Sequence, residues 1–199
     1  MNHEWQMTSL EALNKLKEGN QTYLKALTNP GDISPAIRVT TKEQGQFPYA
    51  IIITCSDSRV IPEAIFSAGI GELFVIRLAG NVIDAHQLGS IEYAAEHLGS
   101  PLIVVMGHTH CGAVDAAMHH DAEGFIKFIT DEICLAIGDE TDPHEACIKN
   151  VNHSLSLIQH SLEIQHVEET HDLAAVGAVY DIETGAVEFL PLLRAGEYL

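Results

Sequence analysis

Three short runs of apolar and β-branched residues divide the first half of the chain, at positions 49–54, 72–77 and 102–106. Two of them show little polar alternation, which is typical of strands that are covered on both faces. A helical pattern at 85–98, closed by glycine and proline, separates the second run from the third. Because strands joined through helices pair in parallel, the pattern predicts an α/β fold with a mostly parallel central sheet flanked by helices.

The N-terminal part of the chain predicts a helical arm over residues 1–30. Thr8 and Glu11 have the spacing of a capping box, and leucines at helical spacing follow them. Asn-Pro-Gly at 29–31 ends the pattern. The apolar stripe of this helix needs a surface to cover, either in its own domain or on a partner subunit.

The C-terminal half predicts two long helices and a hairpin. Residues 111–138 and 142–169 have helical patterns, and two β-rich runs at 173–181 and 186–190 flank Glu-Thr-Gly. The hairpin would add an antiparallel edge to about four strands. With no internal repeat, low-complexity segment or linker, we expect one domain over residues 1–199.

The composition excludes some classes of binding partner and indicates the cellular compartment. Ten basic against 28 acidic residues give a net charge of −18, which repels nucleic acid and anionic membranes. No apolar run reaches the roughly 18 residues of a membrane span, and the first six residues lack the basic start of a secretory signal. We therefore expect a cytoplasmic protein, in which four cysteines serve metal binding or catalysis rather than disulfides.

Unusual polar clusters follow the first and third predicted strands. Cys55, Asp57 and Arg59 alternate after the first, and His108 and Cys111 stand at the end of the third. The carboxyl ends of parallel strands form one rim, where ligands bind. Two thiolates and an imidazole that meet there are good zinc ligands, with a fourth position left for water.

Ordinary packing remains an alternative for each of these groups. A lone cysteine at a strand end is usually a small buried hydrophobe, and Cys134 and Cys147 are read in that way. Among 12 histidines some coincidence is expected. His110 is kept as a neighbour and not a ligand, because in an extended segment it points away from His108.

Four ordered blocks of the sequence resemble the signatures of the β-class carbonic anhydrases: CSDSRVIPEAIF, GELFVIRLAGN, SIEYAAEHLG and GHTHCGAV. The resemblance implies a zinc enzyme that interconverts carbon dioxide and bicarbonate, with one Zn²⁺ per chain. It also implies a homodimer or a multiple of dimers, in which the N-terminal helix embraces the neighbouring subunit.

Carried over position by position, the resemblance implies a role for ten residues. Cys55, His108 and Cys111 would be the zinc ligands. Asp57 would orient zinc-bound hydroxide, and Arg59 would hold Asp57 in place. The implied substrate-binding positions, of which Tyr93 is expected from the partner subunit, are Gln46, Phe74, Ala79, Tyr93 and Gly112.

Two positions depart from patterns in the family. Leu78 stands where most members have asparagine, a change that is either neutral packing or a shift in substrate preference. Ile52 stands where some members carry the tryptophan of an allosteric bicarbonate site, so we expect that site to be absent in that form. In some members the aspartate leaves its arginine and closes the zinc site, and the sequence leaves open which state this chain adopts.

Three rival functions differ in what they need from this chain. A hydrolase of carbonyl sulfide or carbon disulfide would use the same scaffold and site. A non-catalytic zinc-binding scaffold protein would need a broken site, yet all five ligand and orienting residues are present. A nucleic-acid-binding zinc module is disfavoured by the charge of −18. The proton shuttle cannot be chosen among the histidines from sequence.

Overall fold

The fold is built on a five-stranded sheet with the strand order β2-β1-β3-β4-β5. A computed structural model describes residues 6–193, with backbone alone for 192 and 193. The first five residues of the predicted arm lie outside this range. All neighbouring strands pair in parallel except the antiparallel pair β4 and β5, as the sequence predicted. The strands are β1 (Ala50–Thr54), β2 (Leu73–Arg77), β3 (Leu102–His108), β4 (Ala174–Tyr180) and β5 (Val187–Leu193).

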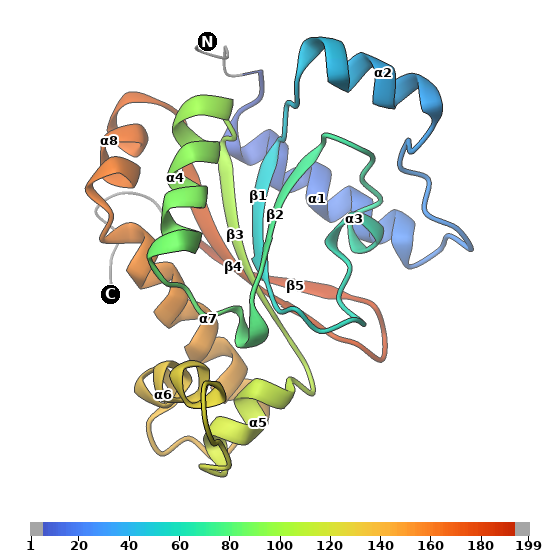
Figure 1. The fold of residues 1–199 in the computed structure, drawn as a ribbon. Coiled ribbons are helices and arrows are strands. Elements are labelled where there is room, and N and C mark those ends of the chain that lie inside the picture. The colour runs from blue at the N-terminus through green and yellow to red at the C-terminus, as the bar shows by residue number, and fades with distance from the viewer. Residues whose placement is uncertain (1–5, 194–199) are drawn as a thin grey trace.

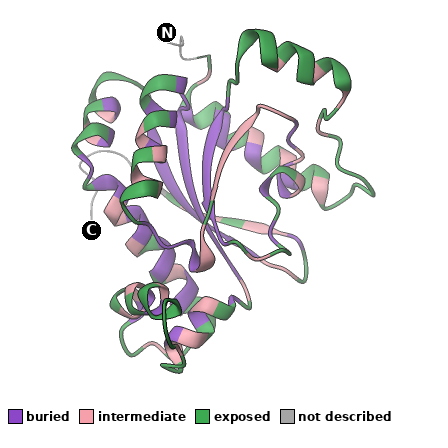
Figure 2. Cartoon of the chain, in the orientation of Figure 1, coloured by how far each residue is buried: buried purple, intermediate pink, exposed green. Residues whose placement is uncertain are grey.

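Alternating side chains of the central strands enter two separate apolar cores. In β1, Ile51 and Ile53 face one core, while Ala50 and Ile52 face the other. Helix α1 (Ser9–Tyr23) covers the second face, and helices α4 (Ala85–Leu98), α7 (Pro143–Gln159) and α8 (Leu162–Thr170) cover the first. The central strands are buried throughout, as Figure 2 shows, which explains their nearly continuous apolar sequences.

Local signals explain where two predicted helices begin and end. Thr8 caps α1 through the predicted capping box with Glu11. The predicted helix at 85–98 is α4, and it ends at Gly99 in a left-handed conformation with φ of 65°.

The prediction of two long helices in the C-terminal half is wrong, because each is divided into two helices in the structure. The first becomes α5 (Gly112–Met118) and α6 (Ile126–Ile137), because His120 and Gly124 adopt positive φ between them. The second becomes α7 and α8, because Ser161 caps the backbone N–H of Ile164 and so starts a new helix.

Two helices were not predicted, although each begins with a proline. Helix α2 (Pro35–Gln44) follows the N-cap Ser34, and the short α3 (Pro62–Ile65) also has proline in its first turn. The three-residue 3₁₀ turn η1 (Ala79–Asn81) follows β2. Figure 1 shows α2 standing away from the sheet, and none of its residues is buried.

The apolar stripe of α1 is partly covered within its own chain. Leu13 and Leu16 are buried against the sheet, whereas Leu10 is 55 % exposed. The predicted contact of this arm with a partner subunit stays a prediction. No helix in the described part of the chain is long and apolar enough to cross a membrane.

Candidate metal centre

Three predicted ligands meet at the carboxyl ends of β1 and β3. Cys55 follows β1 directly, His108 is the last residue of β3, and Cys111 is the N-cap residue of α5. Because β1 and β3 are adjacent parallel strands, their ends bring these side chains together, and their ligand atoms lie within 4.8 Å of one another. His110 is exposed and is not part of this group.

The donor atoms of this cluster fit a zinc ion. The Nε2 atom of His108 is buried, and within the described residues it has no hydrogen-bond partner, which is costly unless a cation binds there. Two thiols and an imidazole are the soft donor set that zinc prefers. The other ring nitrogen, Nδ1, lies 2.9 Å from the carbonyl oxygen of Thr109, which fixes the orientation of the ring.

The two thiols of the cluster differ in how readily they ionise. The thiol of Cys111, and to a smaller extent the backbone N–H of Gly80, lower the pKa of Cys55 to about 4 against the opposing effect of burial. The pKa of Cys111 is raised, because its proton is shared with the neighbouring Cys55 and its side chain is buried. A first thiolate therefore forms easily, and a cation favours the second.

Asp57 and Arg59 form a bidentate ion pair beside the cluster. Nε of Arg59 donates to Oδ1 of Asp57 at 2.9 Å, and Nη2 donates to Oδ2 at 2.7 Å. These bonds hold the pKa of Asp57 well below its usual range. Oδ2 of Asp57 also lies 4.0 Å from Nε2 of His108. The carboxylate is therefore bonded to Arg59 and at the same time close to the ligand cluster. Of the two states left open by the sequence, the structure has the one in which Asp57 is paired with arginine.

The segment after β2 supports the cluster, a role that sequence reasoning did not assign. The guanidinium of Arg77 donates to the carbonyl oxygens of Asp57 at 2.7 Å and Cys55 at 3.3 Å. The backbone N–H of Gly80 donates to Sγ of Cys55 at 3.3 Å. Leu78 packs partly buried against an apolar cluster that includes Cys55 and Cys111. In the sequence, the only sign of this supporting role was the position of Arg77 at the end of a predicted strand.

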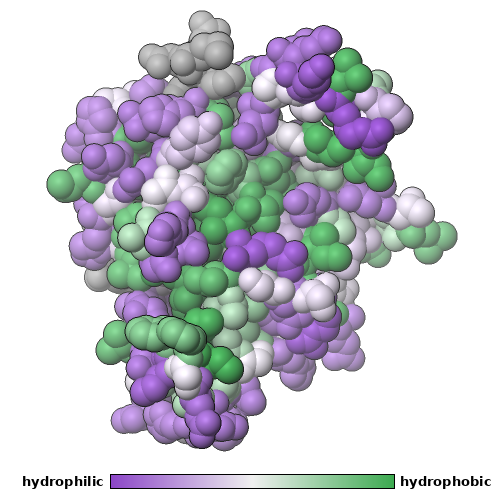
Figure 3. Space-filling view, in the orientation of Figure 1, coloured by the Kyte–Doolittle hydropathy of each residue, from purple (hydrophilic) through white to green (hydrophobic). Residues whose placement is uncertain are grey.

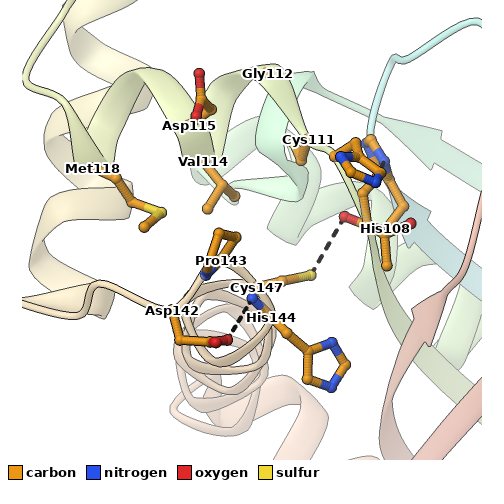
Figure 4. Close-up of a pocket in the computed structure, with 12 residues that line it drawn as sticks. His108, Cys111, Gly112, Val114, Asp115, Met118, Asp142, Pro143, His144 and Cys147 are labelled. Atoms are coloured by element: carbon orange, nitrogen blue, oxygen red, sulfur yellow. Dashed lines mark hydrogen bonds between the residues drawn. The ribbon is translucent and has the colours of Figure 1, made fainter.

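A cavity of about 590 Å³ adjoins the cluster from the side of α5 and α7. Figure 4 shows Cys147 on α7 pointing toward the strand end that carries His108, where its Sγ lies 3.6 Å from the backbone oxygen of His108. Cys147 is buried, and burial raises its pKa to about 11, which agrees with its interpretation as a small packed side chain. The walls of the cavity include His108 and Cys111 but neither Cys55 nor Asp57.

The predicted substrate-binding residues are only partly brought to the cluster within one chain. Ala79 precedes Gly80 in the supporting turn, and Gly112 begins α5 directly after Cys111. Gln46 is exposed and precedes the amino end of β1, whereas Cys55 follows its carboxyl end.

Phe74 and Tyr93 contact each other away from the ligand cluster. Their rings are 6.4 Å apart between β2 and α4, and Tyr93 is 47 % exposed. The face of the molecule drawn in Figure 3 has apolar residues gathered in its middle, where β2 lies in Figure 1. Asp57 and Arg59 therefore lie beside the three ligands, whereas Gln46 precedes the opposite end of β1 and Tyr93 lies on α4 against Phe74.

The fold and this cluster define an α/β protein with a Cys–His–Cys group that could hold a metal ion at the rim of a mostly parallel sheet. The sequence model of the carbonic anhydrase family matches residues 50–187. A carbonic anhydrase of Mycolicibacterium smegmatis is 37 % identical over 187 residues, which cover 87 % of this chain and 89 % of the relative. Carbonic anhydrase 2 of Mycobacterium tuberculosis is 50 % identical over 103 residues, which cover 52 % of this chain and 49 % of the relative.

Solved structures agree with these relatives. The β-carbonic anhydrase CafA of Aspergillus fumigatus superposes with a TM-score of 0.70 at 27 % identity, covering 78 % of this chain and 81 % of its own. The chain belongs to the β-class carbonic anhydrase family, and it is an enzyme of that family.

Proposed function

We propose that this protein catalyses the reversible hydration of carbon dioxide to bicarbonate and a proton, with one Zn²⁺ held by Cys55, His108 and Cys111. A zinc ion bound there supplies Lewis-acid chemistry, which makes water a nucleophile at neutral pH. The observation that carries the proposal is the position of Asp57, whose Oδ2 lies 4.0 Å from Nε2 of His108 while both carboxylate oxygens are bonded to Arg59.

Asp57 has the properties of a group that orients the attacking oxygen. Its pKa is lowered first by the side-chain hydrogen bonds of Arg59, so it is ionised across the neutral range and acts only as an acceptor. A carboxylate in this state can accept a hydrogen bond from the nucleophile and turn a lone pair toward carbon dioxide. Arg59 is bound in turn to the carbonyl oxygen of His110 at 3.2 Å, which limits the movement of the pair.

Apolar side chains around the ligands suit a small, uncharged substrate. Val82, Val114 and Leu78 pack in the same cluster as the two ligand cysteines. Such surroundings exclude competing water and strengthen the electrostatic effect of Asp57. We also propose a homodimer or a multiple of dimers, which is supported by the exposure of Tyr93, a residue expected to serve the site of a partner subunit. We further propose a cytoplasmic location.

The test is stopped-flow hydration of carbon dioxide on protein of measured zinc content. Asp57→Asn should keep its zinc, because Asp57 is not a ligand, and should lose about 100-fold or more of the hydration rate. Asp131→Asn is the matched control, since it removes an exposed carboxylate on α6 that pairs with Lys127 and lies outside the ligand cluster. It should hydrate carbon dioxide at the rate of the unaltered protein.

Two results would contradict the proposal. Full hydration activity in zinc-loaded Asp57→Asn would remove the orienting role. No turnover by the unaltered, zinc-loaded protein between about pH 6.5 and 9, spanning the neutral range in which a zinc site activates water, would reject carbon dioxide as substrate. Carbonyl sulfide and carbon disulfide would then be assayed on the same samples.

A further inference from the structure

The turn after β2 presents a backbone donor to the first metal ligand. The N–H of Gly80 lies 3.3 Å from Sγ of Cys55. Gly80 has a φ of 66°, and a Cβ atom at this position would lie 2.7 Å from Cδ1 of Ile133. Both the conformation and the limited space therefore favour glycine at this position.

Helix α7 holds this turn through two side-chain hydrogen bonds. Nδ2 of Asn150 donates to the carbonyl oxygen of Gly80 at 2.8 Å, and Oγ of Ser154 donates to the carbonyl oxygen of Asn81 at 3.0 Å. Asn150 and Ser154 are both 1 % exposed and lie four residues apart, so they share one face of the helix. Two consecutive carbonyl groups of the turn are thus bonded to one rigid element.

A hydrogen bond to a thiolate changes what the sulfur gives to a metal. It draws electron density away from the sulfur, so the sulfur donates less to a bound cation. This matters at a site with two thiolates, whose charges together equal that of a divalent ion. A donor on Cys55 leaves the cation more electrophilic than two unbonded thiolates would.

We propose that Asn150 and Ser154 are positioning residues of the metal centre. They hold the turn so that Gly80 donates to Cys55, and through that bond they set the donor strength of the thiolate. The inference rests on the proposed metal site, but it does not depend on carbon dioxide as the substrate.

The experiment uses Co²⁺ bound to the full chain, because thiolate ligands give cobalt a charge-transfer band whose energy reports the donor strength of sulfur. In Asn150→Ala the band should move to longer wavelength, since a thiolate without its hydrogen bond gives up an electron more easily. The affinity for Co²⁺, measured by competition with a chelator, should nevertheless fall about 10-fold, because the loss of the support that positions Cys55 outweighs the stronger donation of its sulfur. Ser154→Ala should change both quantities in the same direction and by less, and it keeps the test valid if Asn150→Ala does not fold.

The matched control is Asn20→Ala. Asn20 is also buried, and its Nδ2 donates to the carbonyl oxygens of Ile65 and Gly185, on the side of the sheet that α1 covers. This variant should lose stability without moving the cobalt band.

The outcomes separate the inference from its premises. If both α7 variants keep the band and the affinity of the Asn20→Ala control, the positioning role is wrong. If the unaltered protein gives no thiolate–cobalt band, the metal site itself is wrong. If the band shifts as described in a protein that does not hydrate carbon dioxide, the inference stands and the proposed substrate falls.

Discussion

Cys111 belongs both to the ligand cluster and to the start of α5, where it is the N-cap residue. Its side chain caps no backbone N–H of the helix, so the thiol remains available to the cluster. The neighbouring Cys55 and burial raise its pKa, so a cation bound at the cluster would favour its ionisation. Metal binding and the ionisation of Cys111 would then be linked.

Cys111→Ala should lose zinc, because a site with only Cys55 and His108 retains too few ligands for a stable tetrahedral ion. Zinc content after dialysis, measured by mass spectrometry, checks this. Cys134→Ala is the control, since Cys134 is a half-buried thiol on α6 outside the cluster. Stoichiometric zinc in Cys111→Ala would remove this residue from the ligand set.

At the level of residues, side-chain chemistry was predictable and backbone chemistry was not. Cys55, His108 and Cys111 could be found because each stands where an apolar strand ends. The donor at Gly80 is a backbone N–H, which every residue but proline has, so only its position in space reveals it. Asn150 is joined to it through a contact between residues 70 positions apart.

Helix α7 carries the side chains that hold the supporting turn, and its amino end is itself firmly bonded. Asp142 accepts hydrogen bonds from the N–H groups of His144 and Glu145. Just before it, Glu140 accepts from the N–H groups of Thr141 and Asp142, and pairs with Lys149. The segment that leads into the helix is therefore folded back onto its first turns.

The bonds of Glu140 predict a dependence of stability on pH. They lower its pKa from 4.5 to about 2, with the hydrogen bond from Lys149 as the largest cause. A carboxylate whose pKa is lower in the folded state stabilises the fold above its unfolded pKa, and this contribution is lost as the pH falls toward the folded pKa. Glu140→Gln should therefore be less stable than the unaltered protein above about pH 5, and the difference should disappear toward pH 2. Chemical unfolding at several pH values measures it, and a difference that is independent of pH would contradict the assignment.

At the level of elements, periodicity predicted strands better than helix ends. The apolar runs gave each parallel strand of the first half to within two residues, since strands that are buried on both faces admit few polar residues. The helix break at Ser161 was not predicted, because a helical pattern continues on both sides of it. Only the hydrogen bond from the backbone N–H of Ile164 to Ser161 sets the boundary. Helix α2 was not predicted, and none of its residues is buried in the sheet cores from which the other elements could be recognised.

The outer surface of the molecule has apolar side chains that are exposed in the described part of the chain. Leu27 is fully exposed, Ile33 is 68 % exposed, and α2 beside them buries nothing. A helix of ten residues is marginal in water without a surface to pack on. These features favour the prediction that the N-terminal arm lies against a partner subunit.

Leu27→Asp should weaken self-association, because the contact would bury an unpaired carboxylate. A penalty of roughly 2 kcal/mol corresponds to a loss of more than 10-fold in affinity. Sedimentation at several concentrations should find dimers or multiples of dimers for the unaltered protein and more monomer for the variant. Leu162→Asp is the control, since Leu162 is 75 % exposed on α8, which Figure 1 places across the sheet from the arm. Equal association in both variants would count against the arm as the contact.

The adjacency of β1 and β3 also has a consequence for folding. Cys55 and His108 are far apart in sequence and meet only after the two strands have paired in register. Closing so long a loop costs entropy that a local hairpin avoids, so this pairing forms late compared with local contacts. Until then, only two of the three ligands, His108 and Cys111, are close to each other along the chain. Tight metal binding during refolding would therefore report the moment at which β1 and β3, the centre of the sheet, have paired.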